Sequence, residues 1–223
     1  MKNSLILLAL AGMLSTTAAM AVEVPLYETG PAEDSSFVRF VNGGEKPVDV
    51  IATGSNARIS LDAAKPASDF MAIRAGKAIE GVLARGTAKQ NVSVTVKPGE
   101  FASVIGLDDA AGGLRSVTVL ESPDDFNALK ASVAFYNVDA QCASAALLAA
   151  GRNVVLLDGV PEGQVKRRQI NPVPLSVQLS CGGQAVGQPL DLGTLEAGQR
   201  YTVFLVPAGK SSRIFKATDT VAR

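Results

Sequence analysis

Leu175-Ser176-Val177-Gln178-Leu179-Ser180-Cys181 is a stretch in which apolar and polar residues alternate one by one. This period of two is typical of a β-strand, because successive side chains point to opposite faces of the sheet, one toward a core and one toward water. The same alternation recurs in shorter runs at residues 92–96, 117–119 and 203–205. Turn signals such as Asn42-Gly43-Gly44 and Lys97-Pro98-Gly99 separate the runs. Many short strands punctuated in this way predict an all-β protein.

An internal repeat divides the chain into two similar halves. Phe37-Val38-Arg39-Phe40-Val41-Asn42 reappears 95 residues later as Ser132-Val133-Ala134-Phe135-Tyr136-Asn137, with Val, Phe and Asn matched. Two further echoes follow in the same order at similar spacings, Lys97–Phe101 with Glu196–Tyr201 and Leu114–Val117 with Ser212–Phe215. A unit of roughly 95 to 100 residues fits a small sandwich domain. We therefore predict two tandem β-sandwich domains of the immunoglobulin-like or jelly-roll-like kind.

The first residues carry the layout of a secretory signal peptide. Lys2 gives a positive start, Leu5–Leu14 form a short apolar run, and Ala19-Met20-Ala21 offers a small-residue cleavage site. The apolar run is shorter than the roughly 20 residues that cross a membrane. We therefore expect residues 1–21 to be a signal peptide that is removed on export.

The boundary between the two domains is predicted at the polar, proline-containing stretch Ser122-Pro123-Asp124-Asp125. The predicted domains are therefore residues 22–123 and residues 124–223. Because this linker is short, the two sandwiches should touch rather than tumble freely.

Cys142 and Cys181 are predicted to form a disulfide inside the second domain. The signal peptide implies an oxidising compartment, where such a pair usually bonds. Cys181 ends the alternating stretch on its apolar side, so its side chain should face the core and meet Cys142 there. The alternatives are two free thiols or a metal pair. The chain has no histidine, which excludes a mixed Cys/His zinc site, and two thiolates alone do not complete a tetrahedral site.

The lack of histidine also weighs against catalysis, because Ser-His-Asp and Cys-His nucleophiles need a base with a pKa near neutrality. The chain has no G-x-S-x-G elbow, no P-loop and no dinucleotide-binding glycine motif. The acidic pairs Asp108-Asp109 and Asp124-Asp125 lie beside turn residues, where carboxylates commonly cap turns, although a two-carboxylate glycosidase stays formally open. We predict a protein that is not an enzyme and that has no catalytic, cofactor-binding or metal site.

The charge of the chain offers little attraction for polyanions. Removal of Lys2 leaves 20 positive residues (21 − 1) against 21 negative ones, a net charge of −1. The one basic cluster is Lys166-Arg167-Arg168, with Arg152 upstream. It could contact an anionic polymer or an acidic partner, but we favour a solvated edge strand whose charge prevents edge-to-edge pairing. The chain has no Trp and three Tyr, which further argues against a carbohydrate-binding cleft.

The N-terminal part of the predicted mature chain resembles the AlgF family of alginate O-acetylation proteins. The resemblance lies in Leu26-Tyr27 and in an acidic-serine step into a strand of the form S-x-F-V-R-x-x-N, here Ser35–Asn42. The signal peptide, the length and the tandem β pattern agree with that family across most of the chain. The resemblance implies a periplasmic, non-catalytic protein of two β-sandwiches. It would act with membrane and periplasmic acetyltransferase proteins to pass acetyl groups to the exopolysaccharide alginate.

The expected function is therefore that of a periplasmic adaptor required for alginate O-acetylation, bridging those acetyltransferase proteins by protein–protein contacts. Neither direct binding of the polysaccharide nor a nucleic-acid partner is expected from a chain of this charge. Two alternatives from other classes are a secreted β-sandwich module of surface or adhesion proteins and a pilus-type chaperone. An alginate acetylase of the periplasmic kind would need G-D-S and D-x-x-H motifs, and this chain has neither.

A partner surface is predicted on the first strand of the repeat. If Val38 and Phe40 point inward, then Phe37, Arg39 and Val41 point outward, and arginine beside an exposed aromatic ring is a common composition for an interface hot spot. The alternative is that residues 24–27 cover Phe37 and Val41 and leave only Arg39 exposed.

Overall fold

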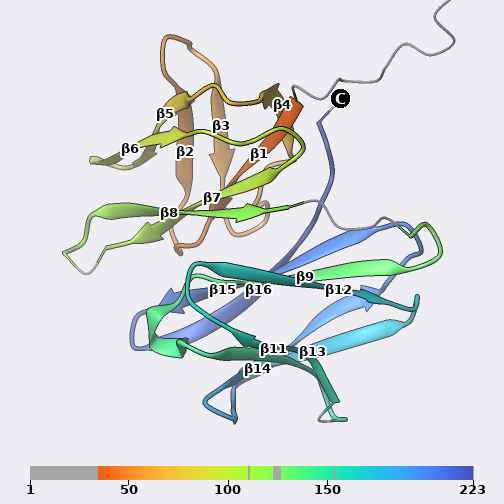
Figure 1. Cartoon of the computed structure of the whole chain (residues 1–223). Coiled ribbons are helices and arrows are strands. Elements are labelled where there is room, and N and C mark those ends of the chain that lie inside the picture. Colours follow the sequence, from red (N-terminus) through yellow and green to blue (C-terminus); the bar gives the residue numbers. More distant parts are fainter. Residues whose placement is uncertain (1–34, 110, 123–126, 153, 223) are drawn as a thin grey trace, which may run out of the picture. The chain divides into compact units, whose positions relative to one another are not determined.

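The structure is a computed structural model that describes residues 35–109, 111–122, 127–152 and 154–222. Strands form nearly all of its regular structure (Figure 1). The first half contains β1 (Ser35–Asn42), β2 (Val48–Ala52), β3 (Arg58–Leu61), β4 (Met71–Arg74), β5 (Ile79–Arg85), β6 (Ala88–Val94), β7 (Phe101–Asp108) and β8 (Leu114–Glu121). The second half contains β9 (Ala131–Asn137), the 3-10 turn η1 (Ala140–Cys142), β10 (Ala145–Ala149), β11 (Val154–Val160), β12 (Gln164–Ile170), β13 (Pro174–Cys181), β14 (Gln184–Thr194), β15 (Arg200–Ala208) and β16 (Ser211–Thr218).

Each half forms a sandwich of two four-stranded sheets. The first sandwich has the strand orders β4-β1-β7-β8 and β3-β2-β5-β6, and the second has β12-β9-β15-β16 and β11-β10-β13-β14. The two sandwiches therefore share one topology, strand for strand. In each, the first strand pairs in parallel with the seventh, β1 with β7 and β9 with β15. The all-β fold with two sandwiches is confirmed.

The repeat extends to individual side chains. Asn42 ends β1 and donates from Nδ2 to the carbonyl oxygens of Lys46 and Leu61. Asn137 ends β9 and donates from Nδ2 to the carbonyl oxygens of Cys142 and Val160. In both cases Oδ1 accepts from the backbone N–H two residues further on. The matched asparagines thus fix the same turn in both halves, because each satisfies backbone groups that would otherwise be buried without partners.

The disulfide between Cys142 and Cys181 is present, with the two Cα atoms 5.3 Å apart. It joins η1 to the end of β13, at the edge of the core that holds Leu147, Leu179 and Leu205. The predicted signal peptide lies outside the described residues, as does the predicted boundary between residues 123 and 124. Within the part of the chain that the structure describes, no helix is long and apolar enough to cross a membrane.

A third apolar core lies between the two sandwiches. It is formed by the outward faces of the sheets β4-β1-β7-β8 and β12-β9-β15-β16. Its fully buried members are Val41, Ile105, Leu107, Val119, Ala134, Tyr136, Val138, Phe204 and Val206. These two sheets have a core on each face. Alternate residues along their strands therefore face two different cores, instead of one core and water.

Candidate functional site

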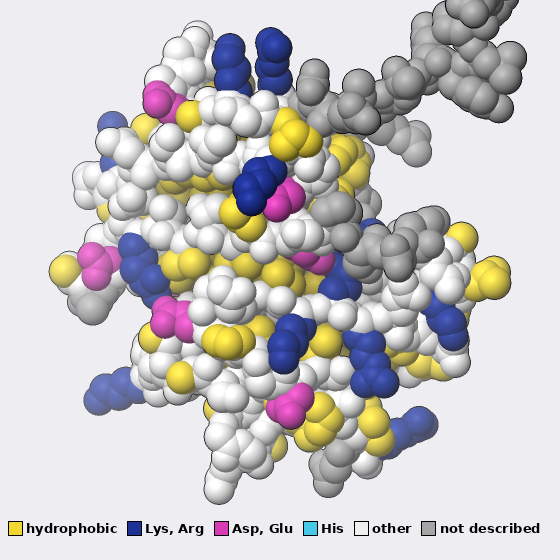
Figure 2. Space-filling view, viewed as in Figure 1, with side chains coloured by type: hydrophobic (Ala, Val, Ile, Leu, Met, Phe, Trp, Pro, Cys, Tyr) yellow, Lys and Arg dark blue, Asp and Glu magenta, His cyan; other side chains and the backbone are white. Residues whose placement is uncertain are grey.

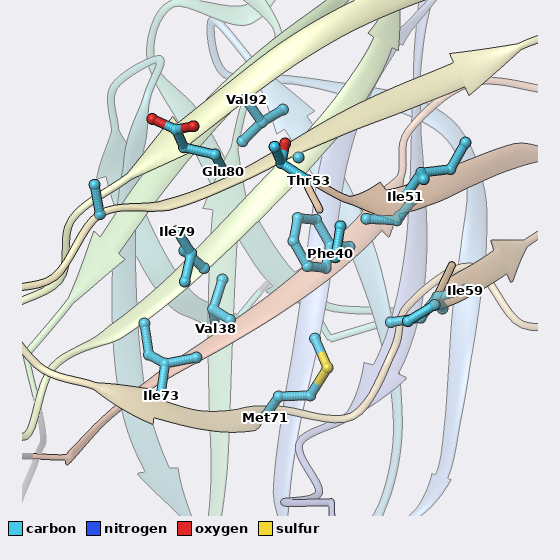
Figure 3. A pocket seen from close by; sticks show the side chains of 15 residues that line it. Val38, Phe40, Ile51, Thr53, Ile59, Met71, Ile73, Ile79, Glu80 and Val92 are labelled. Atoms are coloured by element: carbon cyan, nitrogen blue, oxygen red, sulfur yellow. The ribbon is translucent and has the colours of Figure 1, made fainter. Parts of the chain in front are cut away.

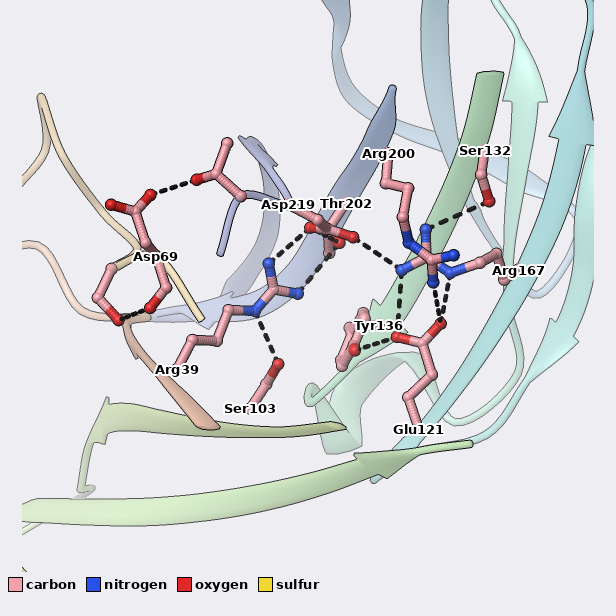
Figure 4. Close-up of polar contacts among 12 residues, drawn as sticks. Arg39, Asp69, Ser103, Glu121, Ser132, Tyr136, Arg167, Arg200, Thr202 and Asp219 are labelled. Carbon is pink, nitrogen blue, oxygen red and sulfur yellow. Dashed lines mark hydrogen bonds and ion pairs between the residues drawn. The ribbon is translucent and has the colours of Figure 1, made fainter. Parts of the chain in front are cut away.

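Arg39 is the centre of a buried polar cluster where the two sandwiches meet (Figure 4). Its side chain is only 1% exposed. Nε donates to Ser103 Oγ at 2.8 Å, Nη1 to Asp219 Oδ1 at 2.6 Å, and Nη2 to Thr202 Oγ1 at 3.1 Å. Ser103 belongs to the first sandwich, whereas Thr202 and Asp219 belong to the second half of the chain. A single guanidinium group therefore ties both halves together.

Arg167 extends the cluster on the second sandwich. Its guanidinium is bidentate to the Glu121 carboxylate and also donates to Asp219 Oδ2 at 2.8 Å. Tyr136 donates its hydroxyl proton to Glu121 Oε2 at 2.5 Å, and Arg200 lies 3.9 Å from Glu121 Oε1. Both carboxylates are therefore held by arginines, whose attraction offsets part of the cost of taking the charges out of water.

Aromatic rings surround the Arg39 guanidinium. Its Cζ atom lies 4.4 Å from the centre of the Phe70 ring, 4.9 Å from that of Phe204 and 5.5 Å from that of Tyr136. Cation–π contacts of this kind stabilise a desolvated cation by about 2 kcal/mol. The rings thus replace part of the hydration that Arg39 loses.

The electrostatics of the cluster keep its charges fixed. Burial and the neighbouring Glu121 raise the pKa of the Tyr136 phenol, although Arg39 opposes them. Burial alone would raise the pKa of the Asp219 carboxyl, but the charges of Arg39 and Arg167 outweigh it and lower that pKa. Burial likewise opposes the charge on Arg167, but its hydrogen bonds to Glu121 hold the pKa of Arg167 above the ordinary value. These shifts in pKa favour the protonated Tyr136 phenol, the charged Arg167 guanidinium and the charged Asp219 carboxylate.

The C-terminal end of the chain completes the joint, the contact region that the polar cluster and the third core form between the two sandwiches. Asp219 follows β16, and the next residues reach the first sandwich. Phe70 donates its N–H to the Thr220 carbonyl at 2.8 Å, and Ala222 donates to the Phe70 carbonyl at 2.8 Å. The C-terminal residues therefore pair with the chain just before β4, in addition to holding Arg39.

The exposed partner surface predicted at Phe37, Arg39 and Val41 is wrong. The predicted alternation is correct, since Val38 and Phe40 do face the core of the first sandwich. Arg39 and Val41, however, are buried at 0% and 1% exposure. Residues of the second sandwich cover Arg39 and Val41, while Phe37 is half-buried and stacks on Phe101 at 4.7 Å. The alternation predicted correctly which way the side chains of this strand point. The residues that bury the outward-pointing side chains come from a part of the chain far away in sequence.

The basic cluster predicted at Arg152, Lys166, Arg167 and Arg168 does not form one patch. Arg167 is buried in the joint between the sandwiches. Lys166 and Arg168 point to the opposite face of β12, where they donate to backbone carbonyls of β11 (Asp158 for Lys166, Val155 and Leu156 for Arg168). Arg152 lies exposed in the turn before β11. On the face seen in Figure 2, Lys and Arg side chains are scattered among uncharged residues.

An apolar cleft of about 430 Å³ opens into the first sandwich (Figure 3). Val38 and Phe40 of β1 line its floor, and Met71 and Ile73 of β4 lie along one side. The remaining lining residues come from β2, β3, β5 and β6 and the turns beside them. Glu80 is the one ionisable side chain among those that line it. A cleft of this size and lining suits an apolar guest.

Sequence reasoning missed the two buried carboxylates that pair with Arg39 and Arg167. A signal existed in the repeat, because Glu121 and Asp219 occupy matched places at the ends of β8 and β16. Glu121 pairs with Phe101 of β7, and Asp219 donates its N–H to the backbone carbonyl of Arg200 at the matched place in β15. Among the described residues, no group of three or more His, Cys, Asp or Glu side chains is placed to hold a metal ion.

The fold and the joint define a class of protein, a pair of topologically identical β-sandwiches fused through a buried arginine–carboxylate cluster. Comparison with protein families gives a match to "Alginate O-acetyl transferase AlgF" over residues 6–202. The chain therefore belongs to the AlgF family. None of the curated proteins matches this chain.

Solved structures resemble the chain only distantly. The C-terminal domain of AlgF from P. aeruginosa is 23% identical, with a TM-score of 0.35 over 40% of this chain and 98% of that one. A protein assigned to cell adhesion from Bacteroides uniformis is 8% identical, with a TM-score of 0.28 over 85% of this chain and 98% of that one. The family assignment rests on the family match.

Proposed function

We propose that this protein is a non-catalytic periplasmic adaptor required for the O-acetylation of alginate. In this role it bridges membrane and periplasmic acetyltransferase proteins through protein–protein contacts. The observation that carries the proposal is membership of the AlgF family, whose description names alginate O-acetyl transfer. That description supports a role in acetyl transfer to alginate, and the adaptor is the form of that role that we propose.

The state of the ionisable groups supports a role without chemistry. The chain has no histidine to act as a base near neutral pH. Glu121 and Asp219 are both buried and both held by arginines. Tyr136 keeps its proton because burial raises its pKa. A general base must be within reach of the proton it removes, and these groups are instead occupied with one another.

The joint between the sandwiches supports the adaptor role. Arg39, Arg167 and the third core fix the two halves against each other. Surfaces on the two sandwiches are thereby held at a set distance and orientation. A protein that holds two others in register needs such a fixed relation, because a flexible link would lower the effective concentration of one partner near the other.

The proposal is tested in three arms. In an alginate-producing bacterium, deletion of the gene should abolish acetyl esters on the secreted polymer, and a copy of the wild-type gene should restore them. The purified chain should bind a purified acetyltransferase protein of the system in analytical ultracentrifugation. It should not turn over p-nitrophenyl acetate.

Each arm has its own contrary result. Normal acetylation after deletion would remove the chain from the pathway. Ester turnover that one point substitution abolishes would make the protein an enzyme. A need for the gene without binding to any acetyltransferase protein would contradict the adaptor role.

A further inference from the structure

The second sandwich is bridged by side chains at the place that matches the apolar cleft of the first. There β11 and β12, the edge strands of the two sheets, have seven residues each and lie against each other. Lys166 and Arg168 of β12 bond to backbone carbonyls of β11 across the gap. The second sandwich therefore shows how this repeat is arranged when the two edge strands close it.

In the first sandwich the corresponding strands are too short to give this cover. β3 and β4 have four residues each. The strand register shows which residues of the two sandwiches correspond. Met71 pairs with Val38, and Arg168 pairs with Val133. Val38 and Val133 are matched in the repeat, so Met71 and Arg168 are matched as well. Met71 therefore stands where Arg168 bridges to β11. It lines the cleft and forms no such bridge.

The edge beside the cleft is able to accept another strand. Within the described residues, β4 is the last strand of its sheet and its residues Met71–Arg74 pair with β1 alone, whereas the C-terminal segment pairs with Phe70 just before it. A strand edge of this kind presents unpaired N–H and C=O groups, which can pair with an added strand. Apolar side chains of that strand, placed at every second residue, would enter the cleft.

Charged residues beside the cleft indicate which residues an added strand should carry. Arg74 ends β4, Lys77 lies in the following turn and Arg58 begins β3, and all three are exposed. Arg58 is paired with Asp49 at 3.4 Å. Arg74 and Lys77 therefore supply the positive charge beside the cleft, against the single carboxylate of Glu80 that lines it. The rim thus favours acidic residues on the incoming segment, next to its apolar part.

We infer that the cleft is a docking site for an extended segment of a partner protein, with aliphatic side chains at alternate positions and acidic residues at one end. This segment adds to the edge of β4 and closes the first sandwich as β11 and β12 close the second. The inference rests on the proposed adaptor function, since it names the kind of partner segment that the adaptor holds.

The test uses a labelled nine-residue peptide with Val or Ile at alternate positions, Ser between them and two Glu residues at one end. Fluorescence anisotropy with the purified chain should show saturable binding. Ile73→Asp should weaken binding at least tenfold. Ile170→Asp is the matched control, because Ile170 pairs with Ala131 as Ile73 pairs with Ser36 in the repeat. This control should change binding less than twofold.

NMR of the methyl groups gives a readout that does not depend on variants folding. The peptide should shift the Met71 and Ile73 methyl signals and leave that of Ile170 in place. A peptide with the two Glu residues replaced by Lys should bind more weakly, with the difference shrinking as salt is added.

Several results would overturn the inference. These are no saturable binding, shifts that map elsewhere, or equal binding of a peptide of the same composition with its aliphatic residues in one block. Equal affinity for decanoate would assign the cleft to an apolar small molecule, and tighter binding of a peptide carrying residues 22–34 would assign it to this chain itself. None of these results bears on the acetylation phenotype of the gene deletion, so the adaptor function and the cleft are tested separately.

Discussion

Arg39 combines more kinds of contact than any neighbour in the joint, because it bonds to three side chains and lies against three aromatic rings. Removing Arg39 takes one of its two arginine partners from the buried Asp219 carboxylate and the bound donor from Ser103 and Thr202. We expect Arg39→Met to lower the free energy of unfolding by about 3–5 kcal/mol for this reason. Urea denaturation followed by circular dichroism measures the loss.

Arg152→Met is the control for Arg39→Met, because Arg152 is exposed. Its effect should stay within about 0.5 kcal/mol, as for most surface substitutions. Similar stability of the two variants would mean that the buried cluster is not a major tie between the sandwiches.

Asp219 should make stability depend on pH in the acid range. Its pKa is lowered in the folded protein, because Arg39 and Arg167 outweigh burial. A depressed folded pKa means that the unfolded chain takes up the proton more readily. The stabilisation is therefore complete above the unfolded pKa of about 3.9, and it is lost as pH falls through the folded pKa. Urea unfolding between pH 7 and pH 2 should show this loss in the wild type.

Asp219→Asn should flatten that part of the curve, since asparagine does not titrate. The variant will be less stable at pH 7, so the slope of stability against pH is the relevant readout rather than its level. A slope below pH 4 identical to that of the wild type would assign the acid sensitivity to other carboxyl groups.

At the scale of elements, the strands themselves were predictable because alternation reports on local geometry. The strand that contains Val177 and Leu179 reads directly from its sequence. The side that each residue faces was also correct for Val38 and Phe40. The covering of the opposite face was not predictable, because it depends on distant packing, such as that of Arg39 against Thr202 and Asp219, 163 and 180 residues away in sequence. Arg167 likewise reads as part of a basic run until Glu121 and Asp219 are brought beside it.

The disulfide acts on one element pair, the turn η1 and the end of β13. Its loop spans 39 residues, for which the chain-entropy model gives about 4 kcal/mol of stabilisation. The double variant Cys142→Ala, Cys181→Ala should lose an amount of this order in urea unfolding under oxidising conditions. The wild type with added reductant should approach the same value. No difference between oxidised wild type and variant would show that the bond constrains little in the unfolded chain.

At the scale of the whole molecule, the short linker led us to expect contact between the sandwiches, and the joint goes further by burying charge and apolar surface together. Ile105 lies at 0% exposure in the third core, although it belongs to the first sandwich. Phe204 of the second sandwich is buried in the same core. Neither sandwich alone can cover these residues. The two halves should therefore depend on each other for stability as well as for orientation.

This dependence predicts how the molecule tumbles. Backbone ¹⁵N relaxation should give one rotational correlation time for residues of both sandwiches, because the joint prevents independent motion. Ile105→Asp places an unpaired carboxylate in the third core, so it should separate the sandwiches and give each a shorter correlation time. Ile59→Asp is the control, since Ile59 is half-buried at the apolar cleft and away from the joint. Two distinct correlation times in the wild type would contradict a fixed joint, and with it the idea that the adaptor holds its partners in register.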